Sequence, residues 1–368
     1  EIKQNGQVET DAGAGGTIIC LAAEELGLTR EELADRIVPD LGFNENLERI
    51  FDYGERQFKV YITPALEVEI FDENDKKLKN MPAPGKKDDE AKAAEAYAEF
   101  KQMKKQMKTT VTNQKLRLEY ALTVNRRWKA VDWEKLFVKN PIMHQFAISL
   151  IWGVYEKEDL KDTFRYMEDG TFNTVDEDEY ELSESAVIGL VHPVELDEEI
   201  KSKWQEQLTD YEITQSIEQL SRPVYRITDA EKKEKSLTKV AGKMLNPLSL
   251  SSKLIGMGWT KGPAMDGGGF YKYIRDDADC GLGVELYFSG AFIGDYASIN
   301  EDDVTVYDAV IYNTETVQYD RKGWGDVAKE SALDLGDVPA RYYSEIVYQL
   351  EKATATSTET NENWQSEK

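Results

Sequence analysis

The residues best suited to chemistry in this chain lie between positions 192 and 222. His192 ends an apolar run, and Asp210, Glu212 and Arg222 follow it within 30 residues. A histidine near carboxylates can transfer protons close to neutral pH, and an arginine can hold a phosphate group. These four side chains form a candidate catalytic cluster for an enzyme that acts on a phosphate-bearing small molecule.

The same four residues also fit a structural role, in which the histidine packs at a strand end and the arginine pairs with a carboxylate. For the other polar motifs, a structural role is favoured more strongly over a catalytic or binding role. His144 lies in a very apolar stretch and is expected to be a core histidine. The run 176–179 is typical of a solvated acidic loop that could at most bind a divalent cation weakly. Asp266-Gly-Gly-Gly-Phe270 leads into an expected strand, so it predicts a tight turn rather than a phosphate-binding loop. Nothing predicts a metal site or a cofactor.

A second candidate is a basic stretch in the first half of the chain. Residues 101–136 carry ten Lys or Arg against three Asp or Glu. A basic helical face with a nearby tryptophan could contact phosphates and stack on bases. The candidate nucleic-acid or partner-binding residues are Lys104, Lys105, Arg126, Arg127 and Trp128. The alternative is that these cations are a solvated face or balance residues 156–218, which carry 20 acidic and five basic side chains.

Composition limits the classes of protein that remain. The 368 residues include 45 Lys or Arg and 70 Asp or Glu, so the net charge of −25 excludes a globally basic nucleic-acid binder. With 40% hydrophobic residues the chain can bury a core. Cys20 and Cys280 are too few and too distant for a disulfide framework or a cysteine zinc site. We find neither a membrane-spanning run nor a signal segment, so a cytoplasmic location is expected.

The periodicity of apolar residues predicts the elements that must position these side chains. In the first half it predicts a helix pair at 17–38 and a meander of three strands at 48–53, 57–62 and 67–72. Two successive helices are predicted at 88–111 and 113–128, and a buried helix at 141–155. In the second half it predicts a hairpin at 163–175 that turns at Asp169–Gly170, a strand at 186–191 and a helix at 246–256. Three further strands are predicted at 270–274, 282–289 and 304–312, followed by a closing helix at 339–352.

Helices and strands come in blocks and do not alternate, which favours an α+β fold. We expect a small N-terminal helix-plus-meander unit at 1–82, a helical middle with an inserted β-hairpin at 83–245 and a C-terminal, mostly antiparallel sheet at 246–352. Residues 353–368 are polar and lack an apolar stripe, so a disordered tail is expected there.

Eight short segments occur in an order that resembles one bacterial family. They are Asp52-Tyr-Gly-Glu-Arg-Gln-Phe, Lys86-Lys-Asp-Asp, Arg117-Leu-Glu, Asn125-Arg-Arg-Trp, Leu150-Ile-Trp-Gly-Val-Tyr, Val191-His-Pro-Val-Glu-Leu, Asp210-Tyr-Glu-Ile and Gln219-Leu-Ser-Arg-Pro-Val-Tyr. The chain is similar, over roughly Leu26 to Leu350, to the C-terminal domain of unknown function 4132 of molybdate metabolism regulator-like (MolR-like) proteins. These proteins often carry a WGR domain upstream.

The resemblance implies a gene-expression role and no particular chemistry. We therefore expect a non-catalytic regulatory or interaction module of a larger protein, with the enzyme described above as the alternative. The chain opens at Glu1 and soon enters the glycine-rich stretch 13–16, which suggests a piece of a longer polypeptide. The expected partner is another protein or the missing N-terminal part of the same polypeptide. The net charge disfavours nucleic acid without excluding it, and no membrane partner is expected.

Overall fold

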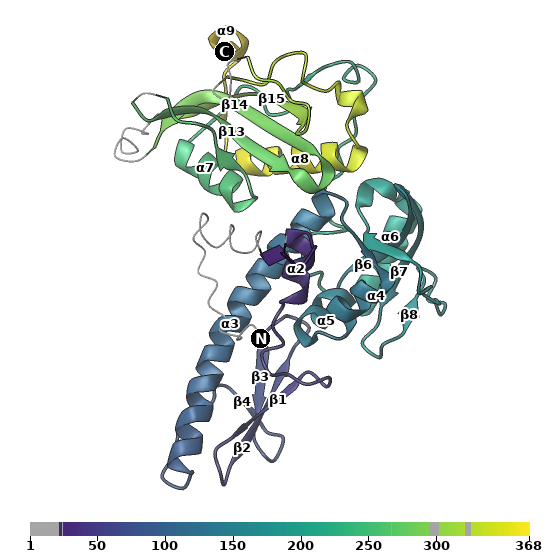
Figure 1. Ribbon diagram of the computed structural model, residues 1–368, viewed down its shortest axis with the longest axis vertical. Helices are drawn as coiled ribbons and strands as arrows, with labels where there is room; N and C mark the ends of the chain where they lie inside the picture. The colour runs from purple at the N-terminus through teal and green to yellow at the C-terminus, as the bar shows by residue number, and fades with distance from the viewer. Residues whose placement is uncertain (1–21, 24, 266, 294–301, 321–324) are drawn as a thin grey trace. The chain divides into compact units, whose positions relative to one another are not determined.

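The computed structural model describes residues 22, 23, 25–265, 267–293, 302–320 and 325–368 (Figure 1). The described chain forms two compact units. Unit 1 is drawn from 1–119, 127–191 and 199–219, and unit 2 from 120–126, 192–198 and 220–368. Helices and antiparallel sheets occur in both units, which confirms the α+β class. The domain boundaries expected from the sequence stay a prediction.

Unit 1 contains a four-stranded antiparallel meander, which confirms the predicted strands. Its strands are β1 (Glu48–Asp52), β2 (Gln57–Ile62), β3 (Val68–Phe71) and β4 (Lys77–Leu78), paired in that order. Helix α2 (Arg30–Arg36) precedes it and begins at a capping box between Thr29 and Glu32. The first part of the predicted pair at 17–38 lies largely outside the described residues.

The prediction of two helices at 88–111 and 113–128 was wrong, because one helix, α3 (Glu90–Thr123), spans 34 residues. Neither glycine nor proline occurs within it. The hydroxyls of Thr109 and Thr112 donate to the carbonyls of Lys105 and Lys108, so these residues satisfy their polar groups without breaking the helix. Phe100 of α3 packs edge-on against Phe51 of β1 with ring centroids 5.6 Å apart.

A five-stranded antiparallel sheet forms the rest of unit 1, in the order β5-β9-β6-β7-β8. The strands are β5 (Arg127–Lys129), β6 (Ile151–Glu156), β7 (Asp159–Tyr166), β8 (Phe172–Asn173) and β9 (Val187–Leu190). The accompanying helices are α4 (Ala130–Trp133), a π-helical turn (Glu134–Val138), α5 (Pro141–Ile148) and α6 (Glu198–Asp210).

The predicted helix at 141–155 was wrong in its second half, since α5 ends at Ile148 and β6 follows. An apolar run of this kind has no period that separates buried helix from buried strand. The β-branched and aromatic residues that follow Leu150 favour the strand. The predicted hairpin is confirmed: β7 and β8 pair across the turn at Asp169–Gly170, where Gly170 adopts a φ of 87°.

Unit 2 is built on a seven-stranded sheet with the main order β12-β13-β14-β15-β11-β16, while β10 also pairs with β15. Its strands are β10 (Ser236–Leu237), β11 (Lys243–Leu245), β12 (Thr260–Lys261), β13 (Gly269–Asp277), β14 (Leu282–Phe292), β15 (Val304–Asn313) and β16 (Glu359–Thr360). The three long strands confirm the predicted C-terminal sheet.

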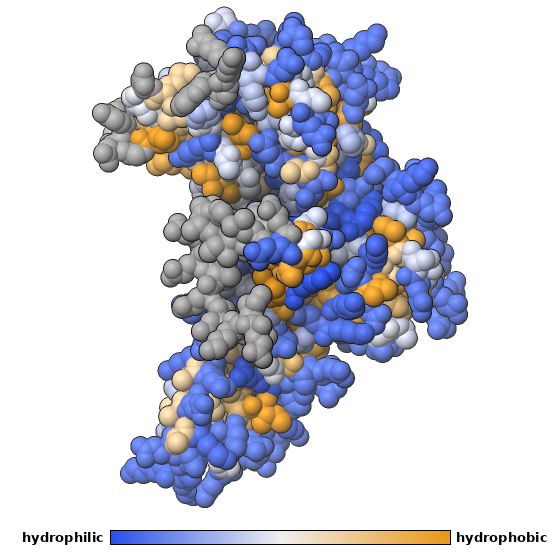
Figure 2. All heavy atoms as spheres, in the orientation of Figure 1, coloured by the Kyte–Doolittle hydropathy of each residue, from blue (hydrophilic) through white to orange (hydrophobic). Residues whose placement is uncertain are grey.

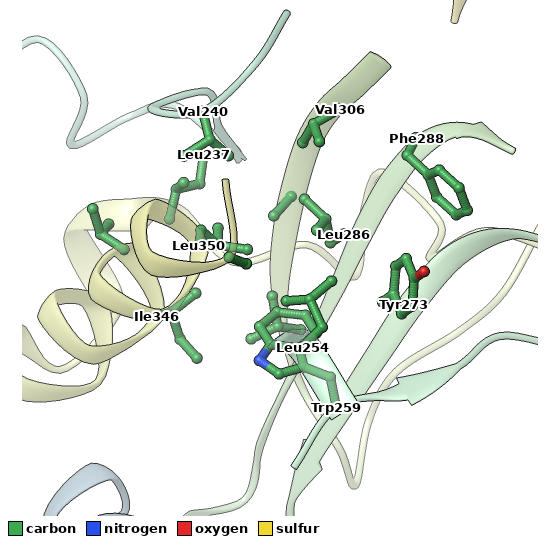
Figure 3. Packing of buried hydrophobic residues seen from close by; sticks show 14 of the residues in the cluster. Leu237, Val240, Leu254, Trp259, Tyr273, Leu286, Phe288, Val306, Ile346 and Leu350 are labelled. Carbon is green, nitrogen blue, oxygen red and sulfur yellow. The ribbon is translucent and has the colours of Figure 1, made fainter. Parts of the chain in front are cut away.

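Helices α7 (Pro247–Gly256) and α8 (Ala340–Thr354) cover one face of this sheet (Figure 1). Figure 3 shows their core side chains, with Ile346 and Leu350 of α8 directed toward Leu286 of β14 and Trp259 beside them. Where a disordered tail was expected, the structure continues α8 and then forms β16, which pairs with β11, and α9 (Trp364–Glu367). The interior of unit 2 is thus organised around α8.

Candidate functional site

Glu345, in the middle of α8, is the centre of a buried polar cluster in unit 2. Its side chain is 0% exposed. His192 Nε2 lies 2.9 Å from Glu345 Oε1, and Arg222 Nη1 donates to Oε2 at 2.7 Å. Thr123 Oγ1 donates to Oε2 at 3.4 Å. One carboxylate therefore bonds to side chains from three separate stretches of the chain.

The backbone around His192 fixes the tautomer of its ring. Residues Pro193–Glu195 form a 3₁₀ turn, and the Val194 N–H donates to His192 Nδ1 at 3.0 Å. Since Nδ1 accepts this bond, Nε2 carries the ring proton and donates it to Glu345. Burial lowers the pKa of His192 more than the carboxylate raises it, which favours the neutral ring.

Glu345 stays ionised in this site. Burial opposes the charge, but the hydrogen bond from His192 and the charge of Arg222 outweigh burial and hold the pKa of Glu345 below its ordinary value. The result is a neutral histidine, a carboxylate and a guanidinium, with Glu345 and Arg222 forming a buried ion pair.

Arg341, one turn before Glu345 on α8, extends the cluster. Its guanidinium pairs with Glu195 and donates to the Leu122 carbonyl at 3.3 Å. The backbone N–H of His192 donates to Glu195 Oε2 at 3.1 Å. Helix α8 thereby holds residues of 120–126, 192–198 and 220–226, which are the segments where the chain enters unit 2.

The chemical capacity of this cluster is limited by burial. His192 and Arg222 are 0% and 2% exposed, and their polar atoms face other protein groups. A hollow of about 410 Å³ in unit 2 has a different lining: Glu231, Glu234, Ser236, Thr238, Asp308, Trp364, Gln365 and Lys368. The arrangement is suited to holding chain segments together and does not present a general base to a substrate.

The four residues of the predicted catalytic cluster divide between the two units. His192 and Arg222 meet at Glu345 in unit 2. Asp210, the last residue of α6, and Glu212, with a φ of 54°, belong to unit 1. Glu345 was missed because its spacing from Arg341 is the (i, i+4) spacing of an ordinary surface pair on a helix.

The basic stretch has an exposed part and a buried part. Lys104 and Lys105 are exposed on α3, as are Lys101 and Lys108. These four residues follow the i, i+3, i+4, i+7 spacing of one helix face, which we call the lysine face. None of them forms a salt bridge with a described residue. No Asp or Glu occurs between Glu99 and Glu119, so the positive charge is continuous along this part of α3.

The other predicted binding residues lie elsewhere. Trp128 is 6% exposed, donates from Nε1 to Asp35 at 2.9 Å and packs edge-on against Phe137. Its ring is therefore part of the core. The Arg127 guanidinium lies 3.2 Å from the centre of the Tyr155 ring. Arg126 belongs to unit 2 and Arg127 to unit 1.

Among the described residues, no group of three or more His, Cys, Asp or Glu side chains could hold a metal ion. Within the same part of the chain, we find no helix with the length and apolar character needed to cross a bilayer.

Comparisons with known proteins identify a family. Residues 76–259 match the family described as a domain of unknown function (DUF4132), and the chain belongs to this family. It is also 38% identical over 248 residues to the uncharacterized protein YehI of Escherichia coli (strain K12), which covers 66% of this chain and 20% of the relative. The chain thus matches about a fifth of the length of that relative. No solved structure matches the chain.

Proposed function

We propose that this DUF4132 chain is a non-catalytic interaction module of a cytoplasmic, MolR-like regulatory protein, and that the lysine face binds an acidic partner protein. The observation that carries the proposal is the lysine face itself. Lys101, Lys104, Lys105 and Lys108 point the same way from a long helix, and none of them is neutralised by a carboxylate of the described residues.

The local charge of α3 contrasts with the charge of the whole chain. In a protein with a net charge of −25, the stretch 100–118 contains five lysines, one arginine and no carboxylate. Exposed charges act over roughly 8 Å at physiological salt, so a ligand on the lysine face is attracted mainly by the nearby lysines and less by the net charge of the whole chain. A positive patch within an acidic protein favours a charged partner of the opposite sign.

The size of the patch favours an acidic protein segment over nucleic acid. From Lys101 to Lys108 the helix rises about 10 Å, which a short acidic segment can cover. A duplex longer than a few base pairs would extend past the patch. Trp128, the predicted stacking residue, lies in the core and is not placed to stack on a base.

The surface supports recognition by charge. In Figure 2, hydrophilic residues cover most of the described surface on the face shown, and hydrophobic residues occur in small separate groups. Isolated apolar residues are ordinary on a protein surface and do not form a large apolar docking patch. Partner binding on this face would rest mainly on ion pairs.

The buried cluster around Glu345 supports the non-catalytic part of the proposal. An enzyme of the predicted kind would need His192, Asp210, Glu212 and Arg222 around one reacting atom. Two of these residues bond to Glu345 inside unit 2, and the other two belong to unit 1. The geometry therefore favours the interaction module over the enzyme.

The regulatory setting rests on the MolR-like resemblance, in which this region follows a WGR domain. The partner segment can then belong to another protein or to the same long polypeptide, because the matched region covers only 20% of the E. coli relative.

Charge reversal tests the proposal. The fluorescence anisotropy of a labelled polyglutamate peptide is titrated with the chain at low salt. We expect the variant with Lys101, Lys104, Lys105 and Lys108 all changed to Glu to bind at least about tenfold more weakly. The matched control changes four other exposed lysines to Glu: Lys86, Lys87, Lys157 and Lys233. Equal losses in the two variants would show that net charge, and not the lysine face, sets the affinity.

A further inference from the structure

A polar layer lies between helix α6 and the five-stranded sheet of unit 1, away from both sites described above. Thr163 and Arg165 alternate with Phe164 on β7, so they share one face of the sheet. Helix α6 packs on this face: Trp204 Nε1 donates to Thr163 Oγ1 at 3.0 Å, and Asn173 Nδ2 donates to Gln207 at 3.5 Å. The labels α6, β7 and β8 locate the layer in Figure 1.

Arg165 is the unusual member of this layer. Its side chain is 1% exposed, yet Nε and Nη1 have no hydrogen-bond acceptor among the described residues. The remaining contacts of the guanidinium are the Met167 sulfur, 2.9 Å from Nη2, and a hydrogen bond to the Tyr211 side chain. A thioether is a weak acceptor. Buried cations are normally paired or fully hydrogen-bonded, so a guanidinium with two nitrogens that lack an acceptor among the described residues requires an explanation.

Asn173 lies directly opposite Arg165 in the antiparallel pair of β7 and β8. It is 8% exposed, and its Oδ1 accepts no hydrogen bond from the part of the chain that the structure describes. Cross-strand neighbours on one face have Cβ atoms about 5 Å apart, so one small molecule can reach both side chains. The pair offers donors on Arg165 and an acceptor on Asn173.

Tyr211 covers the guanidinium from the end of α6. Its ring centre lies 4.2 Å from Arg165 Cζ, and its hydroxyl donates to Glu177 at 3.1 Å. The residue is 45% exposed, so the ring separates Arg165 from solvent. The carboxylates of Glu168 and Glu177 act on Arg165 through their charge, although neither accepts a hydrogen bond from it.

We infer that Arg165 and Asn173 form a binding site for a free α-amino acid, which enters when Tyr211 swings outward. The carboxylate of the ligand accepts hydrogen bonds from the Arg165 guanidinium, and its ammonium group donates to Asn173 Oδ1. The carboxylate thus supplies the acceptor that Arg165 Nε and Nη1 lack, and the ammonium group supplies the donor that Asn173 Oδ1 lacks. A zwitterion has no net charge, so the 20 acidic side chains of 156–218 do not repel it as they would repel a simple anion.

Isothermal titration calorimetry of the whole chain with each common amino acid tests the site, with acetate and methylamine as half-ligand probes. We expect at least one amino acid to bind at concentrations up to about 10 mM, which would fill even a site with a dissociation constant of about 1 mM. Neither half-ligand should bind comparably. Arg165→Met and Asn173→Leu should each weaken binding by about tenfold or more. Arg36→Met, at an exposed position on α2, is the matched control and should bind as the wild type does.

The stability of Arg165→Met gives a second readout that does not depend on ligand. A buried cation with two nitrogens that lack an acceptor destabilises the empty protein, so we expect the methionine variant to unfold at a higher temperature than the wild type. A lower unfolding temperature would mean that ordered water satisfies Arg165 in a purely structural role. That result, or the absence of binding by every amino acid, would overturn the inference.

Discussion

At the scale of single residues, Glu345 is the side chain on which most of the buried polar structure of unit 2 depends. It accepts hydrogen bonds from His192 and Arg222, and both partners are buried with it. A buried ion pair gains little net stability over a well-packed apolar pair, but losing one partner leaves the other charge unpaired. The cluster is therefore sensitive to single changes.

Glu345→Gln should lower the free energy of unfolding by about 3–5 kcal/mol, because Arg222 keeps its charge and loses its carboxylate. The measurement is urea unfolding followed by hydrogen exchange of the α8 amides. The double change Arg222→Met with Glu345→Met should cost at least about 1 kcal/mol less than the sum of the two single changes. Additive losses would mean that the two side chains are not coupled.

His192 should make unit 2 less stable as the pH falls. Burial lowers its pKa in the folded state below the ordinary 6.5. The unfolded chain therefore binds a proton that the folded chain resists, and stability is lost as the pH falls through 6.5. Exchange of the α8 amides in His192→Gln should show a flatter pH dependence; the same slope as the wild type would contradict this.

At the scale of elements, the sequence predicted those whose apolar pattern has a clear period or whose turn has a clear signature. The meander β1 to β3 alternates apolar and polar residues, and the hairpin at Asp169–Gly170 has a typical turn pair. The boundary between α5 and β6 was missed because apolar residues are continuous across it.

The candidate sites were predictable only in part. The exposure of Lys104 and Lys105 was predictable because it follows from helical periodicity along one element, and their binding role stays a prediction. The contact of His192 and Arg222 with Glu345 joins residues 153 and 123 positions apart in the chain. Such a contact depends on tertiary packing and leaves no local pattern. The burial of Trp128 was not predictable for the same reason, since only the fold shows that its ring lies against Phe137.

Asn140 shows how one side chain defines an element. Its Oδ1 accepts hydrogen bonds from the Ile142 and Met143 amides at the start of α5, and its Nδ2 donates to the Val38 carbonyl. We expect Asn140→Ala to lower the unfolding free energy of unit 1 by about 1–2 kcal/mol. Asn140→Asp keeps the cap and should recover most of this loss. Urea titration of both variants checks the prediction, and equal losses would show that the bond to Val38 dominates.

At the scale of the whole molecule, charge is divided unevenly along the chain. The lysine face lies in a stretch without carboxylates, whereas residues 156–218 are strongly acidic. The proposed function uses this division as the docking site for a negatively charged partner. Affinity at such a site should fall as salt rises, because the ion pairs are exposed and screened.

The most direct test compares two probes of equal charge on the wild-type chain. A labelled peptide of about ten glutamates and a single-stranded oligonucleotide of about ten phosphates are titrated at several salt concentrations. The proposed function predicts that the peptide binds at least as tightly as the oligonucleotide and that its affinity falls as salt rises. Tighter binding of the oligonucleotide would identify nucleic acid as the partner. Binding of neither probe at low salt would contradict the lysine face as a docking surface.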